Sequence, residues 1–352
     1  MDPSGLIPVA DSIPTQWGWF YFFLLLTFIL HLLLMNVMLG TGIISLVRHI
    51  RKGNESCPVC KDISLKLPYQ IAFTINFGVA PLLFLQVLYG QFIYVSSIMM
   101  GVYWLSVVGI LVIMYYSAYI YDFKYDNWPN LRLYFLVLMV ALALVIAFFF
   151  TNNMTLMLSP EKWTGFFEDR SGTMLNLGDP TLIPRYLHFV VASIAVGGLF
   201  MAITWQYKQN PKATLYIDQG MKWFTYATLV QVGVGLWFLM SLPGDVMLLF
   251  MGGSALHTII FLLGLAGVVM ILVSGFKKMV WPTTAGLVFT ITFMVLMRDL
   301  VRNAYLAPYY HPSERTVVPE YAPLFIFLVV FILGLGAVFY MLKLAFDAGK
   351  EA

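Results

Sequence analysis

Long, uninterrupted apolar runs dominate the pattern of hydrophobic and polar positions along the chain. Short segments that carry most of the charged side chains separate these runs. A helix needs about twenty apolar residues to cross the hydrocarbon core of a bilayer. The pattern therefore predicts nine membrane-spanning helices, near residues 17–47, 70–95, 102–121, 132–151, 186–206, 222–242, 254–275, 279–298 and 322–346.

The composition excludes a soluble globular protein. Of the 352 residues, 61% are hydrophobic and only 11% are charged, whereas a soluble domain carries about 25% charged residues. The formal net charge of +3 comes from short clusters between the apolar runs, so no basic stripe is left for binding nucleic acid. We find no linker or internal repeat, and we predict one all-α, polytopic membrane domain over residues 1–352, embedded in a lipid bilayer.

The basic residues predict how the bundle is oriented. Nine spans place the two ends of the chain on opposite sides of the membrane. Fourteen of the twenty lysines and arginines fall on the side of the C-terminal tail, and six fall on the other side. Cytoplasmic loops carry an excess of basic residues. We therefore expect the N-terminus outside and the C-terminus in the cytoplasm, in the cytoplasmic (inner) membrane of a bacterium or archaeon.

Three histidines, His31, His188 and His257, lie within predicted spans. Because an ionisable residue is costly inside a bilayer, each is a candidate functional residue. His188 and His257 are expected within about one helical turn of the outer surface, and His31 near the midplane. Two imidazoles at one level on different helices can ligate a low-spin haem b. The alternative is that each histidine only hydrogen-bonds to a neighbouring helix.

A charged group, Arg298, Asp299 and Arg302, ends the eighth predicted span. Such arginines can pair with haem propionates, although topology and lipid phosphates would also explain them. All seventeen acidic residues are expected in loops or at helix ends. The interiors of the spans therefore offer no carboxylate as a proton carrier.

The cysteine pair and the two remaining histidines are not expected to take part in the site. Cys57 and Cys60 lack the following histidine of a c-type haem site. We expect them to be a reduced cytoplasmic pair. His49 and His311 are expected in solvated loops.

Four segments together resemble subunit I of the cytochrome bd-type quinol oxidases, a family with nine spans and an outside N-terminus. Residues 27–31 look like the segment whose histidine ligates the high-spin haem at the oxygen site. Residues 75–80 resemble an Ile-Asn-Phe helix of the family. Residues 185–189 look like the helix whose histidine holds low-spin haem b, and residues 298–302 fall where the family has a glutamate ligand of a second high-spin haem.

The resemblance implies His31, His188 and His257 as ligands of haem iron, with His257 standing in for a family methionine and Asp299 for the glutamate. Three departures weaken the oxidase chemistry. Gln86 aligns with a family glutamate that serves protons and haem, the Gly-Arg-Gln-Pro signature is missing after Asp299, and the quinol-binding loop is reduced to about residues 243–253. The resemblance therefore supports haem binding by this chain more strongly than it supports oxygen reduction.

The favoured expectation is a haem-b electron-transfer subunit of a respiratory complex with other membrane subunits. It would move electrons between the quinone pool and an outer-face partner such as a multihaem c-type cytochrome, with one bis-histidine haem and a second at His31. One alternative is a divergent terminal quinol oxidase using His31 and Asp299. Another is a non-redox transporter or structural subunit whose histidines only pack.

Overall fold

Apolar helices dominate the computed structural model, which describes residues 3–52 and 57–351. Within these residues nine helices are long and apolar enough to cross a membrane, as the sequence predicted. They are α1 (Trp17–Lys52), α2 (Pro58–Met99), α3 (Gly101–Phe123), α4 (Arg132–Met157), α5 (Leu182–Gln206), α6 (Ala213–Met240), α8 (Ala255–Phe276), α9 (Val280–Leu306) and α10 (Ala322–Glu351).

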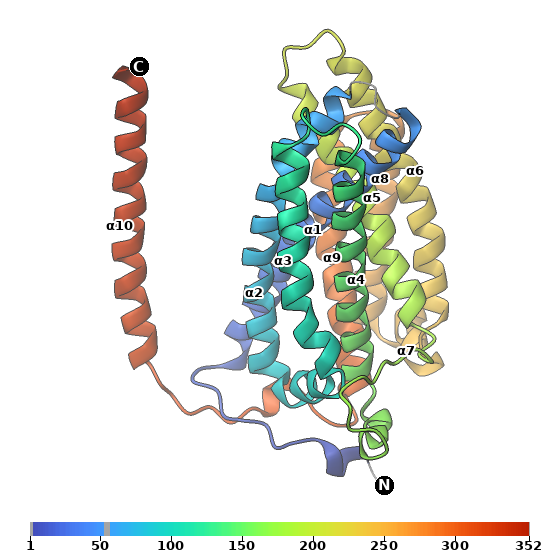
Figure 1. The fold of residues 1–352 in the computed structure, drawn as a ribbon. Helices are drawn as coiled ribbons and strands as arrows, with labels where there is room; N and C mark the ends of the chain where they lie inside the picture. The colour runs from blue at the N-terminus through green and yellow to red at the C-terminus, as the bar shows by residue number, and fades with distance from the viewer. Residues whose placement is uncertain (1–2, 53–56, 352) are drawn as a thin grey trace.

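The helices run roughly parallel to one another, and the chain begins and ends at opposite ends of the bundle (Figure 1). We call the end where α1 begins the N-terminal side. The short elements η1 (Pro3–Leu6), η2 (Pro160–Phe167), α7 (Gly244–Leu248), η3 (Leu249–Gly253) and η4 (Pro312–Glu314) lie on this side. The longer connections between the spans therefore gather there.

Helix α1 packs between α2 and α5, and α5 also packs along α6. Glycines set the distance between these helices. A Cβ added to Gly40 would collide with the backbone carbonyl of Ser193, and one added to Gly197 would collide with the backbone of Gly40. Small residues of this kind let helix backbones approach closely in a membrane. The position of α1 against α5 thus depends on the absence of side chains at this crossing.

Helix α9 is longer than its apolar run. It continues eight residues beyond Arg298, about two turns, to Leu306. The expectation that Asp299 ends a span is therefore wrong, because α9 has neither glycine nor proline after Arg298, and the charged side chains find neighbours inside the bundle. Asp299 is 2% exposed.

Helices α1 and α2 also extend beyond their apolar runs, and this corrects two expectations. His49 lies within α1 and is buried, so it is not in a solvated loop, whereas His311 is exposed as expected. Cys57 caps α2 and is disulfide-bonded to Cys60, with their Cα atoms 5.2 Å apart. The expectation of a reduced pair is wrong because the first turn of the helix places the two sulfurs within bonding distance.

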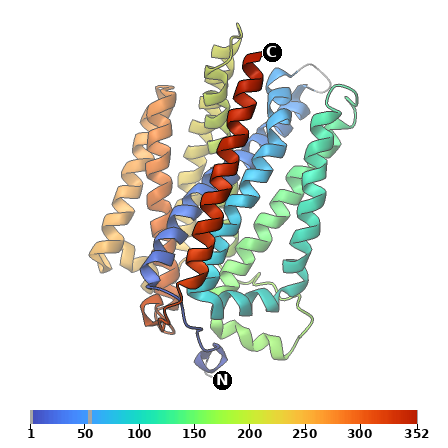
Figure 2. The same cartoon turned by 90° about the vertical axis from the view of Figure 1, so that its left-hand side faces the viewer.

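Helix α10 stands apart from the other helices in Figure 1, and it lies in front of them in the view of Figure 2. None of the residues in its most apolar window is buried. The segment before it is nevertheless fixed to the bundle. Arg315 donates hydrogen bonds to the carbonyls of Asp11 (2.6 Å) and Val87 (2.8 Å). The second carbonyl lies next to a kink in α2 at Tyr89, which has φ −129° and ψ 30°.

The glycine crossing gives a stability prediction with a matched control. Replacing Gly197 with alanine should lower the free energy of unfolding by about 1–3 kcal/mol, because the added methyl meets the backbone of α1. The control is Gly233→Ala in α6, where an added Cβ meets nothing within 4 Å. This substitution should instead stabilise the helix by about 0.5–1 kcal/mol. Thermal unfolding of both variants in detergent is the measurement. Equal melting temperatures would show that the crossing is not tight.

Candidate functional site

The carboxylate of Asp299 is the centre of a buried hydrogen-bond network on the N-terminal side. It accepts hydrogen bonds from the Tyr21 hydroxyl of α1 and from the Arg302 guanidinium, which also forms an ion pair with it. Asn303 donates a third hydrogen bond at 3.1 Å and accepts one from Tyr89 at 2.7 Å. Arg302 in turn lies 4.3 Å from the centre of the Tyr89 ring. Both carboxylate oxygens are thus engaged, and Asp299 neutralises Arg302.

Two more arginines lie close by and have no such partner among the described residues. Arg185, at the start of α5, is 7% exposed. It makes one long hydrogen bond, 3.4 Å, to the Thr181 hydroxyl and lies 5.1 Å from the centre of the Phe238 ring, while its Nε has no partner. Arg298 lies 4.3 Å from the centre of the Phe28 ring.

Arg298 is within electrostatic range of both Arg302 and Arg185. We call these three residues the arginine cluster. The only carboxylate that is bonded to the cluster in the described part of the chain is Asp299. Asp179 is within electrostatic range of Arg185, but its carboxylate is ion-paired with Lys162 at 3.8 Å. A buried charge without a partner costs several kcal/mol. The cluster therefore carries more positive charge than its bonded carboxylate neutralises.

His31 lies next to this cluster on α1. Its Nδ1 is 3.1 Å from the carbonyl oxygen of Thr74, and Gly78 of α2 leaves room for the ring. Because a carbonyl can only accept, Nδ1 must carry the proton, and Nε2 keeps a free lone pair. Metal-binding histidines are oriented in this way. Arg298 is within electrostatic range of His31, so the structure brings together two residues that the sequence placed at separate sites.

His188 lies one turn after Arg185 on α5. Its ring faces α6, where a Cβ on Gly235 would lie 3.3 Å from Cε1. The Nδ1 atom is buried and has no hydrogen-bond partner in the described residues. Gln231 donates a hydrogen bond to the backbone carbonyl of His188 at 2.9 Å. Because buried polar atoms are rarely left unpaired, Nδ1 of His188 is a candidate ligand atom.

His257 begins α8 and is partly buried. Its Nδ1 is 2.9 Å from the Ser254 hydroxyl, and its ring centre is 5.2 Å from that of Phe250. The ring of His188 contacts Phe238, at 6.2 Å between centres. Phe238 packs against the same apolar cluster as Phe250. Both histidines thus border one cluster, but no direct contact joins their rings in the described part of the chain, and their shared ligation of one haem stays a prediction.

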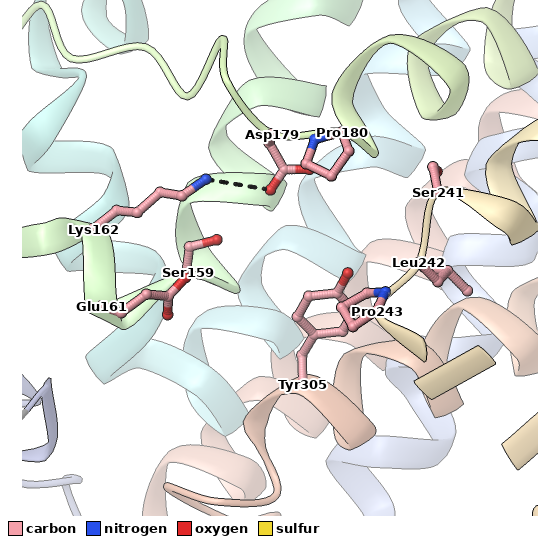
Figure 3. Close-up of a pocket in the computed structure, with 9 residues that line it drawn as sticks. All are labelled: Ser159, Glu161, Lys162, Asp179, Pro180, Ser241, Leu242, Pro243 and Tyr305. Carbon is pink, nitrogen blue, oxygen red and sulfur yellow. Dashed lines mark ion pairs between the residues drawn. The ribbon is translucent and has the colours of Figure 1, made fainter. Parts of the chain in front are cut away.

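A cavity of about 340 Å³ opens on the N-terminal side between η2, the segment before α5, the turn after α6 and the end of α9 (Figure 3). The ion-paired Lys162 and Asp179 form one wall, and Tyr305 and Pro243 lie opposite. None of the predicted haem ligands lines it. Tyr305 is within electrostatic range of Arg185, so the cavity lies near the arginine cluster. The three arginines are not among its lining residues.

Several residues of this site could not be found from the sequence. The sequence marks Arg185 only as one of the twenty basic residues and as part of the segment 185–189. Asn303 carries a weak signal, since it lies four residues after Asp299 and so shares its helix face. Tyr21 carries none, because 278 residues separate it from Asp299.

The expected haem would need an acceptor for its acidic groups and free ring nitrogens. The arginine cluster has the charge for the first, and among the described residues Nδ1 of His188 is unpaired and Nδ1 of His31 is bonded to Thr74, which leaves its Nε2. Comparisons of the chain with protein-family models, with curated proteins and with solved structures found no match. The resemblance to the bd-type oxidases therefore stays a prediction from the four segments.

Asp299 can be tested apart from any ligand. Asp299→Asn removes the one carboxylate that is bonded to the cluster among the described residues, so we expect a loss of about 3–5 kcal/mol in the free energy of unfolding. The double variant Asp299→Asn/Arg302→Gln also removes a positive charge and should recover part of that loss. Chemical unfolding of the single and double variants is the measurement. A single variant as stable as the unmodified protein would contradict the role assigned to this carboxylate.

Proposed function

We propose that this protein is a haem-b-binding electron-transfer subunit of a membrane respiratory complex, similar in architecture to subunit I of the bd-type oxidases. The observation that carries the proposal is the arginine cluster beside His31 and His188. Arg185 and Arg302 are buried and Arg298 is half-buried, and among the described residues one carboxylate, that of Asp299, is bonded to the cluster. Haem b would supply anionic groups and a metal that takes a free imidazole nitrogen.

The residues divide into ligands, anion-binding groups and scaffold. His188 and His257 are proposed as the ligands of one haem iron and His31 as a ligand of a second. Arg298, Arg302 and Arg185 would hold propionates, and Asp299 keeps Arg302 in place through its ion pair. Haem iron, when bound, carries single electrons. The apolar helices exclude water from the site.

The two alternatives differ in what they require of Asp299 and His188. A terminal oxidase needs Asp299 as a ligand or a proton carrier, but both of its oxygens already accept hydrogen bonds. A transporter or structural subunit needs its histidines to be satisfied by protein groups, and Nδ1 of His188 is not. The first observation favours electron transfer over rapid oxygen reduction, and the second favours a haem protein over a transporter or structural subunit.

We propose that the N-terminal side faces outward and the opposite side faces the cytoplasm of a bacterium or archaeon, on the basis of the fourteen basic residues against six. The arginine cluster then lies toward the outer face. A multihaem c-type cytochrome is the partner proposed there, and a quinone or quinol is proposed as the other redox partner.

Histidine variants test haem binding. The protein purified from a haem-sufficient host should show a b-type reduced-minus-oxidised spectrum. His188→Ala and His257→Ala should each remove the low-spin EPR signal, and His31→Ala should remove a second haem. His311→Ala is the matched control, because this histidine is exposed and bonded to Ser313.

Two outcomes would overturn the proposal. A protein without haem absorption leaves the transporter or structural function. Fast, quinol-sustained oxygen uptake that disappears in His31→Ala identifies an oxidase. A low-spin signal unchanged in both the His188 and His257 variants would refute that ligand pair alone.

The orientation is tested by single cysteines in a Cys57→Ser/Cys60→Ser background. Ser171 and Asn127 are exposed in loops at opposite ends of the bundle. An impermeant maleimide applied to intact cells should label Ser171→Cys, whereas Asn127→Cys should react only after lysis. The reverse result would place the N-terminal side in the cytoplasm.

A further inference from the structure

The disulfide between Cys57 and Cys60 lies at the start of α2, at the end of the bundle opposite the arginine cluster. Cys57 is the N-cap residue, with an extended backbone at φ −121° and ψ 91°, and proline follows it in the first turn. The backbone N–H of Cys60 donates a hydrogen bond of 3.2 Å to Sγ of Cys57. The N-terminal sulfur thus receives both an amide hydrogen bond and the positive end of the helix dipole.

This environment favours a thiolate at Cys57 once the disulfide is reduced. Cysteines at helix N-termini and in Cys-X-X-Cys pairs have a lowered pKa, and the thiolate is the form that exchanges with disulfides. Cys60 differs from Cys57, because it is fully buried whereas Cys57 keeps 3% of its surface exposed. Both residues are buried, and Cys57 is the one nearer the surface, so we assign its sulfur as the one that an incoming thiol attacks and the sulfur of Cys60 as the leaving group.

Two tyrosine hydroxyls contact the backbone of the pair. Tyr125 donates a hydrogen bond of 3.3 Å to the carbonyl of Cys57, and burial raises the pKa of this tyrosine, so it stays protonated. The Tyr121 hydroxyl lies 3.5 Å from the carbonyl of Cys60 and 2.9 Å from Nε2 of His49. The two tyrosines thus hold the backbone of the first turn of α2 through the carbonyls of Cys57 and Cys60.

The proposed orientation puts this disulfide at the cytoplasmic end. Disulfides that persist in a reducing compartment are in most cases transient, catalytic or redox-sensing, because cellular thiols reduce the others. A disulfide here is therefore not explained by structural stapling alone. The helix-capping geometry of the pair indicates reversible chemistry, and the cytoplasmic location, which rests on the proposed orientation, agrees with it.

We propose that Cys57 and Cys60 form a reversible redox site that exchanges electrons with low-molecular-weight thiols. A thiolate attacks Sγ of Cys57, the Cys57–Cys60 bond breaks, and the sulfur of Cys60 leaves as a thiolate and takes a proton. A second thiolate attacks the bound thiol's sulfur and releases Cys57. Two thiols become one disulfide, and two electrons and two protons pass to the pair. This site goes beyond the electron-transfer function and does not depend on haem.

Thiol counting on the full chain in lipid nanodiscs tests the proposal. The protein is equilibrated with mixtures of reduced and oxidised glutathione, quenched with acid, alkylated and weighed intact. We expect the count of free thiols to change from none to two in one step as the reduced fraction rises, and to return to none on reoxidation. A pair that is reduced only after unfolding would be an inert staple and would overturn the proposal. Two free thiols in every mixture would overturn it as well.

Single variants test which sulfur is attacked by the incoming thiol and which one leaves. In Cys60→Ser the remaining Cys57 should form a mixed disulfide with glutathione, whereas Cys60 in Cys57→Ser should do so about tenfold more slowly, because it is enclosed. Equal rates, or a faster Cys60, would contradict the assigned roles. The measurement on the unmodified chain needs neither variant to fold.

Discussion

Buried positive charge is the constraint on which the N-terminal half of the bundle depends. An arginine inside a bilayer is stable only with a partner or with access to water, and the arginine cluster brings three of them together. Asp299 neutralises Arg302, and Tyr21 of α1 and Asn303 hold that carboxylate. The network joins α1 to α9, and Tyr89 attaches it to the kink of α2.

Helix packing and the candidate site meet in α1. The glycine crossing with α5 fixes the position of α1 in the bundle. The same helix then presents Tyr21 to Asp299, Phe28 to Arg298 and the ring of His31 to α2. An error in the crossing would therefore displace groups at three contacts of the site. The close contact of α1 and α5 at the glycine crossing thus positions the polar groups of the candidate site.

The sequence predicted the number of spans because apolar length alone decides whether a helix can cross a bilayer. It also singled out His31, His188 and Asp299, since polar residues are conspicuous in apolar runs. It did not predict that α9 continues past Arg298, because hydropathy ends where charged residues begin even when those residues are paired. The Tyr21–Asp299 contact and the burial of Cys57 arise from helix packing, which one sequence does not encode locally.

The central claim is that the uncompensated charge of the arginine cluster is met by haem. A pyridine haemochromogen assay, combined with a protein determination, counts haem per polypeptide in the purified chain. The account predicts at least one haem b per chain in protein from a haem-sufficient host, and a reduced count when Arg298 is replaced by glutamine. A chain that folds, keeps its arginine cluster and contains no haem would contradict it.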